Sequence, residues 1–250
     1  MTLDIITHHA LEPMTHGFFG RKGGASSGVF EGLNCGAGSS DQSDVVRVNR
    51  GYAAQAMGVA PDQMAGVHQV HSAEVLTVGP EPEAGVRADG LVTATPGVAL
   101  SVLAADCQPV LFADPDAQVI GAAHAGWRGA LDGVLDATVE AMVGLGATRE
   151  KIQAVIGPCI SQRAYEVGPE FFDRFLDEEP DNTRFFAGGQ GDRMMFDLPS
   201  YGLARLRAAG VEATWTGHCT YSDPERFYSY RRSTHEGAND YGRLISVITL

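Results

Sequence analysis

An α/β fold in a single domain is the class that the sequence predicts, and three observations support it. Short apolar, β-branched runs alternate with amphipathic helical patterns along the chain. The 31 glycines suit a protein with many tight turns between strands and helices. No repeat, low-complexity tract or linker interrupts the chain, so residues 1–250 are expected to form one domain with a full hydrophobic core.

Charge and cysteine content exclude several kinds of partner and setting. The net charge of −13 argues against nucleic acid or an anionic membrane as a partner, because both attract basic surfaces. The N-terminus lacks the basic and apolar regions of a signal peptide, and no apolar run approaches the ~18 residues of a membrane span. The four cysteines are scattered, which predicts a reduced, cytoplasmic setting without a disulfide framework. No long amphipathic stretch indicates an interface, so a monomer is expected.

The N-terminal part of the chain predicts a glycine-rich loop followed by a helix. Residues 16–40 are rich in glycine and serine and contain Arg21 and Lys22, so they form either a phosphate-binding loop or an ordinary surface hairpin. No Gly-Lys-Ser/Thr follows, which excludes a P-loop. Residues 44–57 carry apolar side chains at helical spacing, and Gly58 is a natural helix stop.

Two histidines lie in the next segment, residues 66–78. His68 and His71 are three positions apart, so on a regular strand their side chains would point to opposite faces. Both therefore cannot serve one metal ion if the segment is a regular strand. His71, at the turn-like His-Ser-Ala, is the expected site residue, and His68 is expected to be structural or to support the site indirectly. Residues 88–90 predict a turn before a strand at 91–93.

The central stretch, residues 98–128, combines buried strands with chemically reactive side chains. Its apolar runs predict strands at residues 98–104, 109–113 and 119–123. Asp106 and Cys107 follow the first strand, and His124 follows the third. Polar residues at the ends of buried strands are typical of sites in α/β proteins. For the cysteine or the histidine alone, the alternative is a small buried thiol or a satisfied core histidine.

The C-terminal half predicts alternating strands and helices. Residues 129–145 form the clearest helix, with a buried apolar stripe and an acidic stripe that faces solvent. Its start lies beside Arg128, where free N–H groups are able to bind an anion. The acidic run at residues 177–182 predicts an exposed loop. Further strands are expected at residues 152–156, 211–216 and 244–250, and further helices at residues 169–176 and 199–208.

His71, Cys107 and His124 together indicate a metal centre. Three nitrogen and sulfur ligands with an open fourth position are the pattern of a catalytic zinc site, although the spacing here matches no short zinc signature. A competing hypothesis makes Cys107 a nucleophile with His124 as its base. The two hypotheses exclude each other at any one moment, because a metal-bound thiolate attacks poorly. A third hypothesis is a small-molecule binding module with an inert core thiol.

Two metalloenzyme classes fail on residue content. A multicopper oxidase needs many histidines, mostly in His-x-His pairs, whereas this chain has eight histidines and no such pair. Copper is therefore disfavoured as the bound metal. A cytidine-deaminase zinc site needs His-x-Glu and Pro-Cys-x-x-Cys. Glu74 stands at the wrong offset from His71, and Gln162 stands where the second cysteine after Cys159 belongs.

An ordered set of motifs covers the chain from about His16 to Leu250. The motifs are HGFFGRKGGASSGVFEGLN, VNR at 48–50, HQVHSAEV, ADG at 88–90, AADCQPV, AAHAGWRG, IGP at 156–158 and FYSYRR. As a set they are specific, and the chain resembles the YfiH-like family, also called the laccase-domain or multicopper polyphenol oxidase family. The resemblance implies a single-domain layered α/β/β/α sandwich, likened to the catalytic domain of cytotoxic necrotizing factor toxins, which use a Cys-His pair.

The resemblance also implies purine nucleoside chemistry at a zinc site. The histidine of HQVH, the cysteine of ADC and the histidine of HAGWRG are the implied zinc ligands and catalytic residues, namely His71, Cys107 and His124. The implied activities are phosphorolysis of adenosine, inosine and methylthioadenosine and deamination of adenosine, with purine nucleosides and phosphate as small-molecule partners. Correction of peptidoglycan precursors is an implied alternative, and oxidation of polyphenols with copper is the least favoured.

Binding of phosphate and ribose requires cations and N–H donors. The candidates are Arg21, Arg50, Arg128 and Arg231. The chain departs from the family pattern at residues 233–242, where several residues including His235 are inserted. If this loop borders the pocket, substrate preference is expected to differ. Cys159, which follows Gly-Pro at a strand end, has no assigned role.

Overall fold

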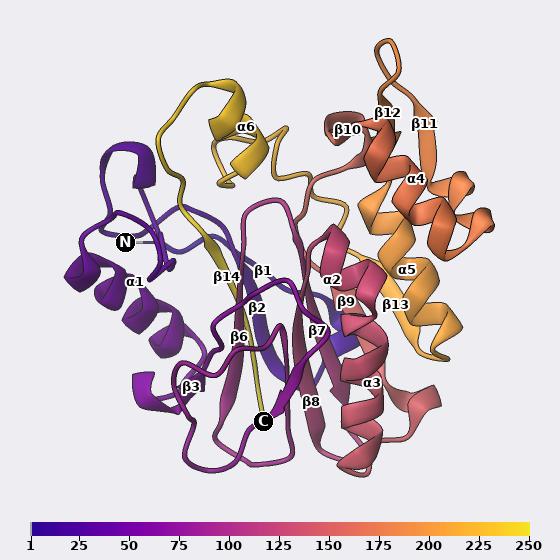
Figure 1. The fold of residues 1–250 in the computed structure, drawn as a ribbon. Coiled ribbons are helices and arrows are strands. Elements are labelled where there is room, and N and C mark those ends of the chain that lie inside the picture. The colour runs from indigo at the N-terminus through magenta and orange to yellow at the C-terminus, as the bar shows by residue number, and fades with distance from the viewer. Residues whose placement is uncertain (1) are drawn as a thin grey trace.

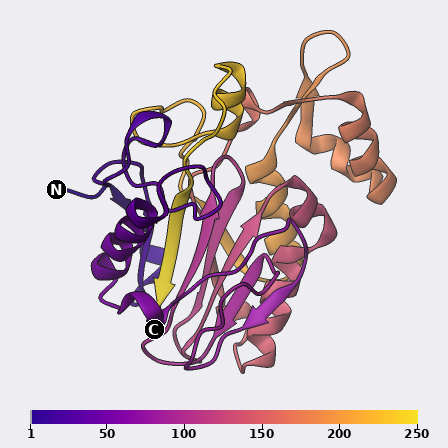
Figure 2. The same ribbon diagram turned by 60° about the vertical axis from the view of Figure 1, so that its left-hand side comes forward.

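Two stacked β-sheets form the centre of the protein, and helices cover both outer faces (Figure 1). The computed structural model describes residues 2–250. One sheet has five strands and the other has six, and a third sheet of three short strands stands to one side. Figure 2 shows this third sheet projecting from the main body together with the helix that covers it.

The five-stranded sheet pairs N-terminal strands with the C-terminal strand. In spatial order it contains β1 (Ile5–Ile6), β2 (Thr15–Phe19), β14 (Leu244–Thr249), β6 (Ala99–Ala104) and β3 (Met64–Ala65). β14 lies in the middle and pairs antiparallel with both β2 and β6. The predicted N-terminal helix is confirmed as α1 (Ser43–Ala56), and it covers the outer face, where Ala53 and Met57 belong to one apolar cluster with Phe19 and Val247.

The six-stranded sheet carries the central stretch of sequence. In spatial order it contains β13 (Glu212–Trp215), β9 (Gln153–Ile156), β7 (Gln108–Asp114), β8 (Val119–Ala125), β5 (Gly90–Thr93) and β4 (Val75–Thr77). β7 and β8 are buried along their whole length, which accounts for their continuous apolar sequences. They form an antiparallel hairpin that turns at Asp114, whose carboxylate accepts the N–H groups of Asp116 and Ala117.

An apolar layer joins the two sheets, and a second layer joins the six-stranded sheet to its helices. Between the sheets, Leu100, Val102 and Ile248 meet Leu111 and Ile120. The outer face of the six-stranded sheet is covered by α2 (Trp127–Asp132), α3 (Val134–Gly144) and α5 (Leu198–Ala208). The order helix, sheet, sheet, helix confirms the layered α/β/β/α fold.

The single helix predicted over residues 129–145 is wrong, because the structure has two helices there. α2 already begins at Trp127, and α3 begins at Val134. Gly133 lies between them with a φ of 97°, a left-handed conformation that glycine adopts without steric cost. Apolar residues continue at helical spacing across the break, so Gly133 was the only residue in the sequence that indicated two helices.

A smaller unit between β9 and β13 contains six of the seven phenylalanines of the C-terminal half. It consists of β10 (Glu166–Val167), α4 (Pro169–Glu178), β11 (Phe186–Gly188) and β12 (Met194–Phe196). The ring centroids of Phe171, Phe175 and Phe196 lie 4.7 to 5.2 Å apart. Residues 177–181 are exposed as predicted, but the loop predicted at residues 177–182 is wrong. α4 extends into this run, a 3-10 helix follows, and Asn182 is buried, with its amide donating to the Phe175 carbonyl.

Short helices complete the fold. α6 (Tyr230–His235) was not expected from the sequence. The 3-10 helices are His9–Leu11, Gly28–Phe30, Pro61–Gln63, Arg149–Lys151, Gln162–Ala164 and Pro180–Phe185. Over residues 2–250, no helix has both the length and the apolar character that crossing a bilayer requires.

Candidate metal centre

Three side chains from separate parts of the chain converge at one end of the six-stranded sheet. His71 lies in the loop before β4, Cys107 lies in the turn between β6 and β7, and His124 lies near the end of β8. One ligand atom from each lies within 4.8 Å of the others. The two imidazole rings meet edge to face, with centroids 4.8 Å apart. The three atoms are therefore close enough to share one ion.

Gly126 leaves the space in which this cluster forms. A Cβ atom at this position would lie 2.6 Å from Nδ1 of His71 and 2.9 Å from Sγ of Cys107. Its φ of −66° is open to any residue, so the requirement for glycine is steric rather than conformational. The glycine of the AHAGWRG motif thus brings the backbone directly against two of the three candidate ligands.

Cys107 is oriented by an unusual backbone conformation at Asp106. Asp106 has a φ of 88°, which is rare for a residue with a side chain. Its buried carboxylate accepts hydrogen bonds from the hydroxyl groups of Thr220 and Ser229, at 2.6 and 2.9 Å, and from the N–H of Arg231 at 2.7 Å. These three bonds tie the turn that carries Cys107 to the segment that leads into α6.

His71 reaches the cluster because residues 68–71 do not form a regular strand. His68 makes only an isolated bridge to Arg87, and His71 itself has a φ of 60°. The alternation of side chains that applies to a strand therefore does not apply here. The structure brings His71 into the cluster and leaves His68 outside it, where His68 lines the adjoining cavity.

Asp89 is the residue that sequence reasoning missed, because it was interpreted only as part of a turn. Its buried Oδ1 lies 2.9 Å from Nδ1 of His124. Its Oδ2 accepts the N–H groups of Val70 and Ser72, at 3.0 and 2.7 Å, and the hydroxyl of Ser72 at 2.9 Å. One carboxylate thus orients His124 and also fixes the loop that carries His71. A carboxylate that hydrogen-bonds to a ligand histidine is a recurring feature of metal sites. That recurring pattern is the signal by which Asp89 could have been identified.

The pKa values of the two histidines in the cluster are shifted in opposite directions. Burial by itself lowers the pKa of His124, but the Cys107 thiolate and the hydrogen bond with Asp89 outweigh burial and raise it to about 9. Burial and the neighbouring His124 lower the pKa of His71, which favours its neutral, metal-binding form. Burial tends to raise the pKa of Asp89, but bonds with His124, Ser72 and Val70 lower it overall. The carboxylate behind His124 is therefore charged.

The cluster opens into a cavity of about 1080 Å³. Residues on both sides of the cluster line it. One side includes Arg50, Gly66 and Ser101, and the other includes the aromatic residues Trp127, Tyr165 and Phe171; Tyr230 and Tyr241 also line the cavity. The inserted segment at residues 233–242 does border the cavity, because Tyr241 belongs to it. A cavity of this size accommodates a small organic substrate together with an anion.

Only two of the four candidate arginines line the cavity. Arg50 and Arg231 line the cavity, and Arg243, which was not among the candidates, lines it too. Arg21 is not among the lining residues, since its guanidinium donates to the carbonyl oxygens of Glu31 and Pro224 and lies 4.6 Å from the ring centroid of Tyr228. Arg128 is exposed beside the ring of Trp127 and does not line the cavity either.

The glycine-rich residues 16–40 begin with β2 and continue as a loop held by Asn49 of α1. The Asn49 side chain accepts from the N–H of Ala25 and donates to Ser26 Oγ and the Asn34 carbonyl. Of this loop, residues 36–38 reach the cavity. The glycines before them serve close backbone packing, as at Gly24, where a Cβ would lie 2.1 Å from the Gly32 carbonyl oxygen.

Cys159 and Cys219 face each other outside the cluster. They form an isolated parallel bridge between backbone segments. Cys159 is buried, whereas Cys219 is half-buried and its sulfur accepts hydrogen bonds from the hydroxyl groups of Ser161 and Ser222. Neither cysteine is part of the candidate metal centre.

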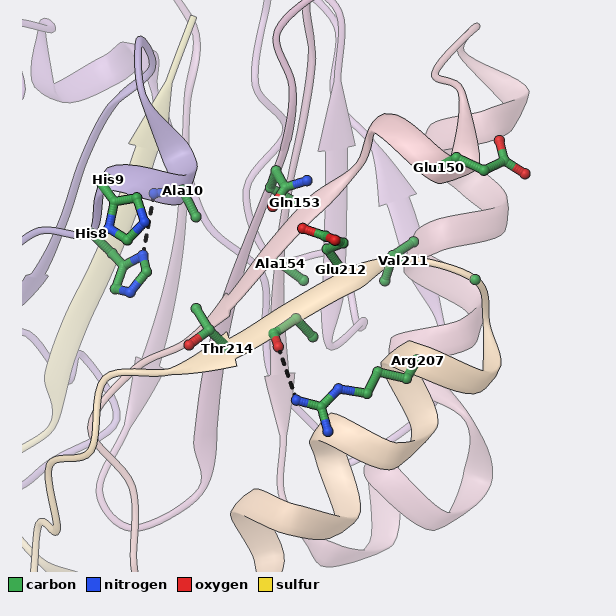
Figure 3. Close-up of a pocket in the computed structure, with 12 residues that line it drawn as sticks. His8, His9, Ala10, Glu150, Gln153, Ala154, Arg207, Val211, Glu212 and Thr214 are labelled. Atoms are coloured by element: carbon green, nitrogen blue, oxygen red, sulfur yellow. Dashed lines mark hydrogen bonds between the residues drawn. The ribbon is translucent and has the colours of Figure 1, made fainter.

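A second cavity, of about 860 Å³, lies at the free edge of the six-stranded sheet along β13 (Figure 3). Figure 3 shows His8 and His9 on one side, and Arg207 on the other, where its guanidinium donates to the carbonyl of Ala213. None of the site residues predicted from the sequence lines this cavity. The predicted site residues that do line a cavity all line the one beside His124.

Comparisons with known proteins give the same family as the motifs. Residues 15–250 match the family described as multi-copper polyphenol oxidoreductase laccase. The chain is 42% identical over 243 residues to a Deinococcus radiodurans protein named purine nucleoside phosphorylase, covering 94% of this chain and 88% of that protein. It is 38% identical over 231 residues to the Escherichia coli K12 protein named purine nucleoside phosphorylase YfiH, covering 92% and 91% of the two chains.

Two solved structures share the fold. A Neisseria meningitidis protein superposes with a TM-score of 0.87 at 33% identity, covering 100% of this chain and 99% of that chain. Bacillus licheniformis YfiH superposes with a TM-score of 0.87 at 28% identity, covering 95% and 92%. The layered sheets and the His-Cys-His cluster define an α/β protein with a candidate metal centre. The chain belongs to the YfiH-like laccase-domain family.

Proposed function

We propose that this protein is a zinc enzyme that cleaves purine nucleosides by phosphorolysis and also deaminates adenosine. The proposed substrates of phosphorolysis are adenosine, inosine and methylthioadenosine. The observation that carries the proposal is the cluster of His71, Cys107 and His124 at the wall of a cavity that is also lined by arginines. The names of the Deinococcus radiodurans and Escherichia coli relatives support the choice of purine nucleosides as substrates.

The donor set fits zinc. Two imidazole nitrogens and one thiolate are ligands that zinc prefers, and three protein ligands leave its fourth position open. The short approach of Gly126 to two of the side chains leaves no room for a larger residue between them. When bound, zinc supplies a Lewis acid that polarises oxygen groups and lowers the pKa of water. His71, Cys107 and His124 would hold it, and Asp89 would orient His124.

Arg50 and Arg231 are the proposed phosphate-binding residues. Within residues 2–250, neither forms a salt bridge with an acidic side chain, so both retain their charge for a ligand. The Arg50 guanidinium makes one long contact, 3.5 Å, with the Cys35 carbonyl. Arg231 is held more firmly, because its N–H donates to Asp106 and its Nη1 donates to the Glu166 carbonyl at 2.7 Å. Guanidinium groups of this kind bind phosphate oxygens through charge-assisted hydrogen bonds.

Phosphorolysis requires the cavity to hold phosphate beside the ribose of the nucleoside. The bond between C1′ of ribose and the purine nitrogen breaks, an oxygen of the hydrogen phosphate dianion forms a new bond to C1′, and the proton that the phosphate loses is taken up by the leaving purine. Arg50 and Arg231 would hold the phosphate dianion beside the ribose and reduce the entropic cost of bringing the two reactants together.

A cysteine hydrolase is the second candidate function. Cys107 and His124 are neighbours in the cluster, and Cys107 is among the groups that raise the pKa of His124 to about 9, so a thiol and a candidate base stand together as a nucleophile and its base would. In that case activity would survive removal of metal by a chelator and would be lost on treatment with iodoacetamide. Editing of peptidoglycan precursors would instead require binding of a nucleotide-linked sugar. A copper polyphenol oxidase stays the least favoured, because the chain has only eight histidines.

The test is an assay of the zinc-loaded protein with adenosine, with and without phosphate. The proposal expects adenine and ribose 1-phosphate only when phosphate is present, and inosine whether or not phosphate is present. Arg50→Ala should raise the KM for phosphate by about tenfold or more, since a charge-assisted contact is worth about 1.5–3 kcal/mol. Arg47→Ala, one turn away on α1 and exposed, is the matched control. Release of adenine at the same rate without phosphate would contradict phosphorolysis.

A further inference from the structure

We propose that Tyr230 is the platform on which the purine base stacks, and that Tyr241 supports it from behind. This inference rests on the proposed function, because it places the base of the nucleoside substrate within the same cavity. Both tyrosines line the cavity, and their ring centroids lie 5.1 Å apart with the planes tilted by 58°. Tyr241 belongs to the segment at residues 233–242, where the sequence departs from the family pattern.

The exposure of Tyr230 has no explanation in packing. Its side chain is 53% exposed, and among the residues that the structure describes only Val29 and Val48 are comparable large apolar residues on the surface. Neither valine lines the cavity, whereas Tyr230 does. An exposed aromatic ring at the wall of a cavity provides a face on which a flat ligand can stack. Tyrosine also loses little conformational entropy on binding, since it has few rotatable bonds.

The backbone holds Tyr230 at a fixed position relative to the metal ligands. Its two neighbours both bond to the Asp106 carboxylate, Ser229 through its hydroxyl and Arg231 through its N–H. Asp106 directly precedes Cys107 in the chain. A base stacked on Tyr230 is thereby placed within reach of the cluster, with Arg231 as the next residue along the chain.

Tyr241 is anchored so that it can support the platform. Asp240 accepts hydrogen bonds from the N–H and hydroxyl of Ser40, at 2.7 and 2.9 Å, which ties the inserted segment to the glycine-rich loop. The Arg243 guanidinium lies 4.2 Å from the ring centroid of Tyr241 and donates to the Asp240 carboxylate. A cation packed against the ring attracts its face and restrains the ring.

The other aromatic residues of the cavity already have partners. The ring of Trp127 packs against Phe171 at 4.9 Å and has Arg128 and Arg174 at 5.3 and 5.6 Å. Tyr165 has Arg231 at 5.2 Å on its ring and is in contact with the Phe171 cluster. These rings build the wall, whereas Tyr230 has Tyr241 as its one ring partner among the residues described.

Recognition by stacking predicts a particular specificity. A stacked ring contacts the face of the base and makes no contact with the substituent at its edge. Nucleosides of adenine and hypoxanthine should therefore bind with similar affinity. A single-ring pyrimidine offers less area and should bind more weakly. The inserted segment would therefore favour purines as a class rather than one purine.

The test compares Tyr230→Ala and Tyr230→Phe, with Val48→Ala as the control for loss of an exposed apolar side chain outside the cavity. Base–aromatic stacking corresponds to a change of about 5- to 150-fold in affinity. Tyr230→Ala should raise the KM for adenosine and for inosine within this range while kcat changes little, and Tyr230→Phe and Val48→Ala should behave as wild type. Tyr241→Ala should raise the same KM by a smaller factor.

Calorimetric binding of inosine without phosphate separates this inference from the proposed function, because inosine is neither deaminated nor cleaved under these conditions. If the wild type binds inosine but releases no base with phosphate, phosphorolysis is wrong while the stacking platform stands, provided that Tyr230→Ala weakens binding. If the wild type is active and Tyr230→Ala binds inosine and turns over adenosine as the wild type does, the platform is wrong. A fall in kcat with unchanged KM in Tyr230→Ala would also overturn it, because stacking acts on binding.

Discussion

The carboxylate of Asp89 lies 2.9 Å from Nδ1 of His124, and the same carboxylate holds the backbone of the loop that carries His71. Two of the three candidate ligands therefore depend on one buried acid. Because Nδ1 of His124 is engaged with Asp89, its other ring nitrogen is the one left for the cluster.

Asp89→Asn should weaken zinc binding by about 10- to 100-fold, because the amide supports His124 and the His71 loop less well. The measurement is competition for zinc with a chromophoric chelator. Asp114→Asn is the matched control, since Asp114 is also buried in the six-stranded sheet but bonds only to backbone N–H groups away from the cluster. Equal zinc affinity in wild type and Asp89→Asn would show that this carboxylate does not support the centre.

Gly126→Ala should abolish metal binding while the fold is retained. The added methyl group would overlap the side chains of His71 and Cys107, so both would have to move away from their positions in the cluster. The φ of Gly126 suits alanine, so little backbone strain is expected. Gly144→Ala serves as the control, because its Cβ would meet open space and alanine is favoured in a helix. Metal content and circular dichroism together check this prediction, and a fully metal-loaded Gly126→Ala protein would contradict it.

The cysteines outside the cluster should differ in reactivity. Burial tends to raise the pKa of Cys219, but hydrogen bonds from Ser161 and Ser222 outweigh burial and lower it, whereas burial raises the pKa of Cys35 to about 12 and that of Cys159 well above its usual value. The thiolate is the reactive form, so its fraction at neutral pH is greatest at Cys219.

In the zinc-loaded protein, iodoacetamide should therefore modify Cys219 before Cys35 and Cys159, as peptide mass spectrometry can determine. Ser161→Ala removes one of the stabilising bonds and should shift the pH profile of Cys219 alkylation to higher pH. Modification of Cys159 ahead of Cys219, or an unchanged profile in Ser161→Ala, would run against the assignment of these hydrogen bonds.

Much of the fold could be predicted because its signals are local. Apolar runs bounded by Gly, Pro and Asp predicted every strand of the six-stranded sheet except β4, and helical periodicity predicted α1 and α5. The break at Gly133 was missed because apolar periodicity continues across it. The third sheet and α6 were missed because their elements are short and are stabilised by packing and by bonds to distant residues such as Asp106.

The candidate site was predictable only in part, for the same reason. Strand ends located Cys107 and His124, and the turn-like His-Ser-Ala located His71. The role of Asp89 depends on contacts with residues up to 35 positions away, which no local pattern specifies. The arginines show most clearly what the sequence could not predict. Arg21 lies near the glycine-rich loop, but its guanidinium bonds to backbone carbonyl oxygens. Arg243 lies near the C-terminus and was not a candidate, yet it lines the cavity.

Cys107→Ala provides the most direct test of the metal centre, with zinc content and phosphate-dependent release of adenine measured on the same preparation. Cys219→Ser is the control, because Cys219 lies outside the cluster. The wild type and the control should each contain about one zinc ion per chain and release adenine, whereas Cys107→Ala should lose most of the zinc and all of the activity. A Cys107→Ala protein with a full complement of zinc and unchanged release of adenine would contradict the account.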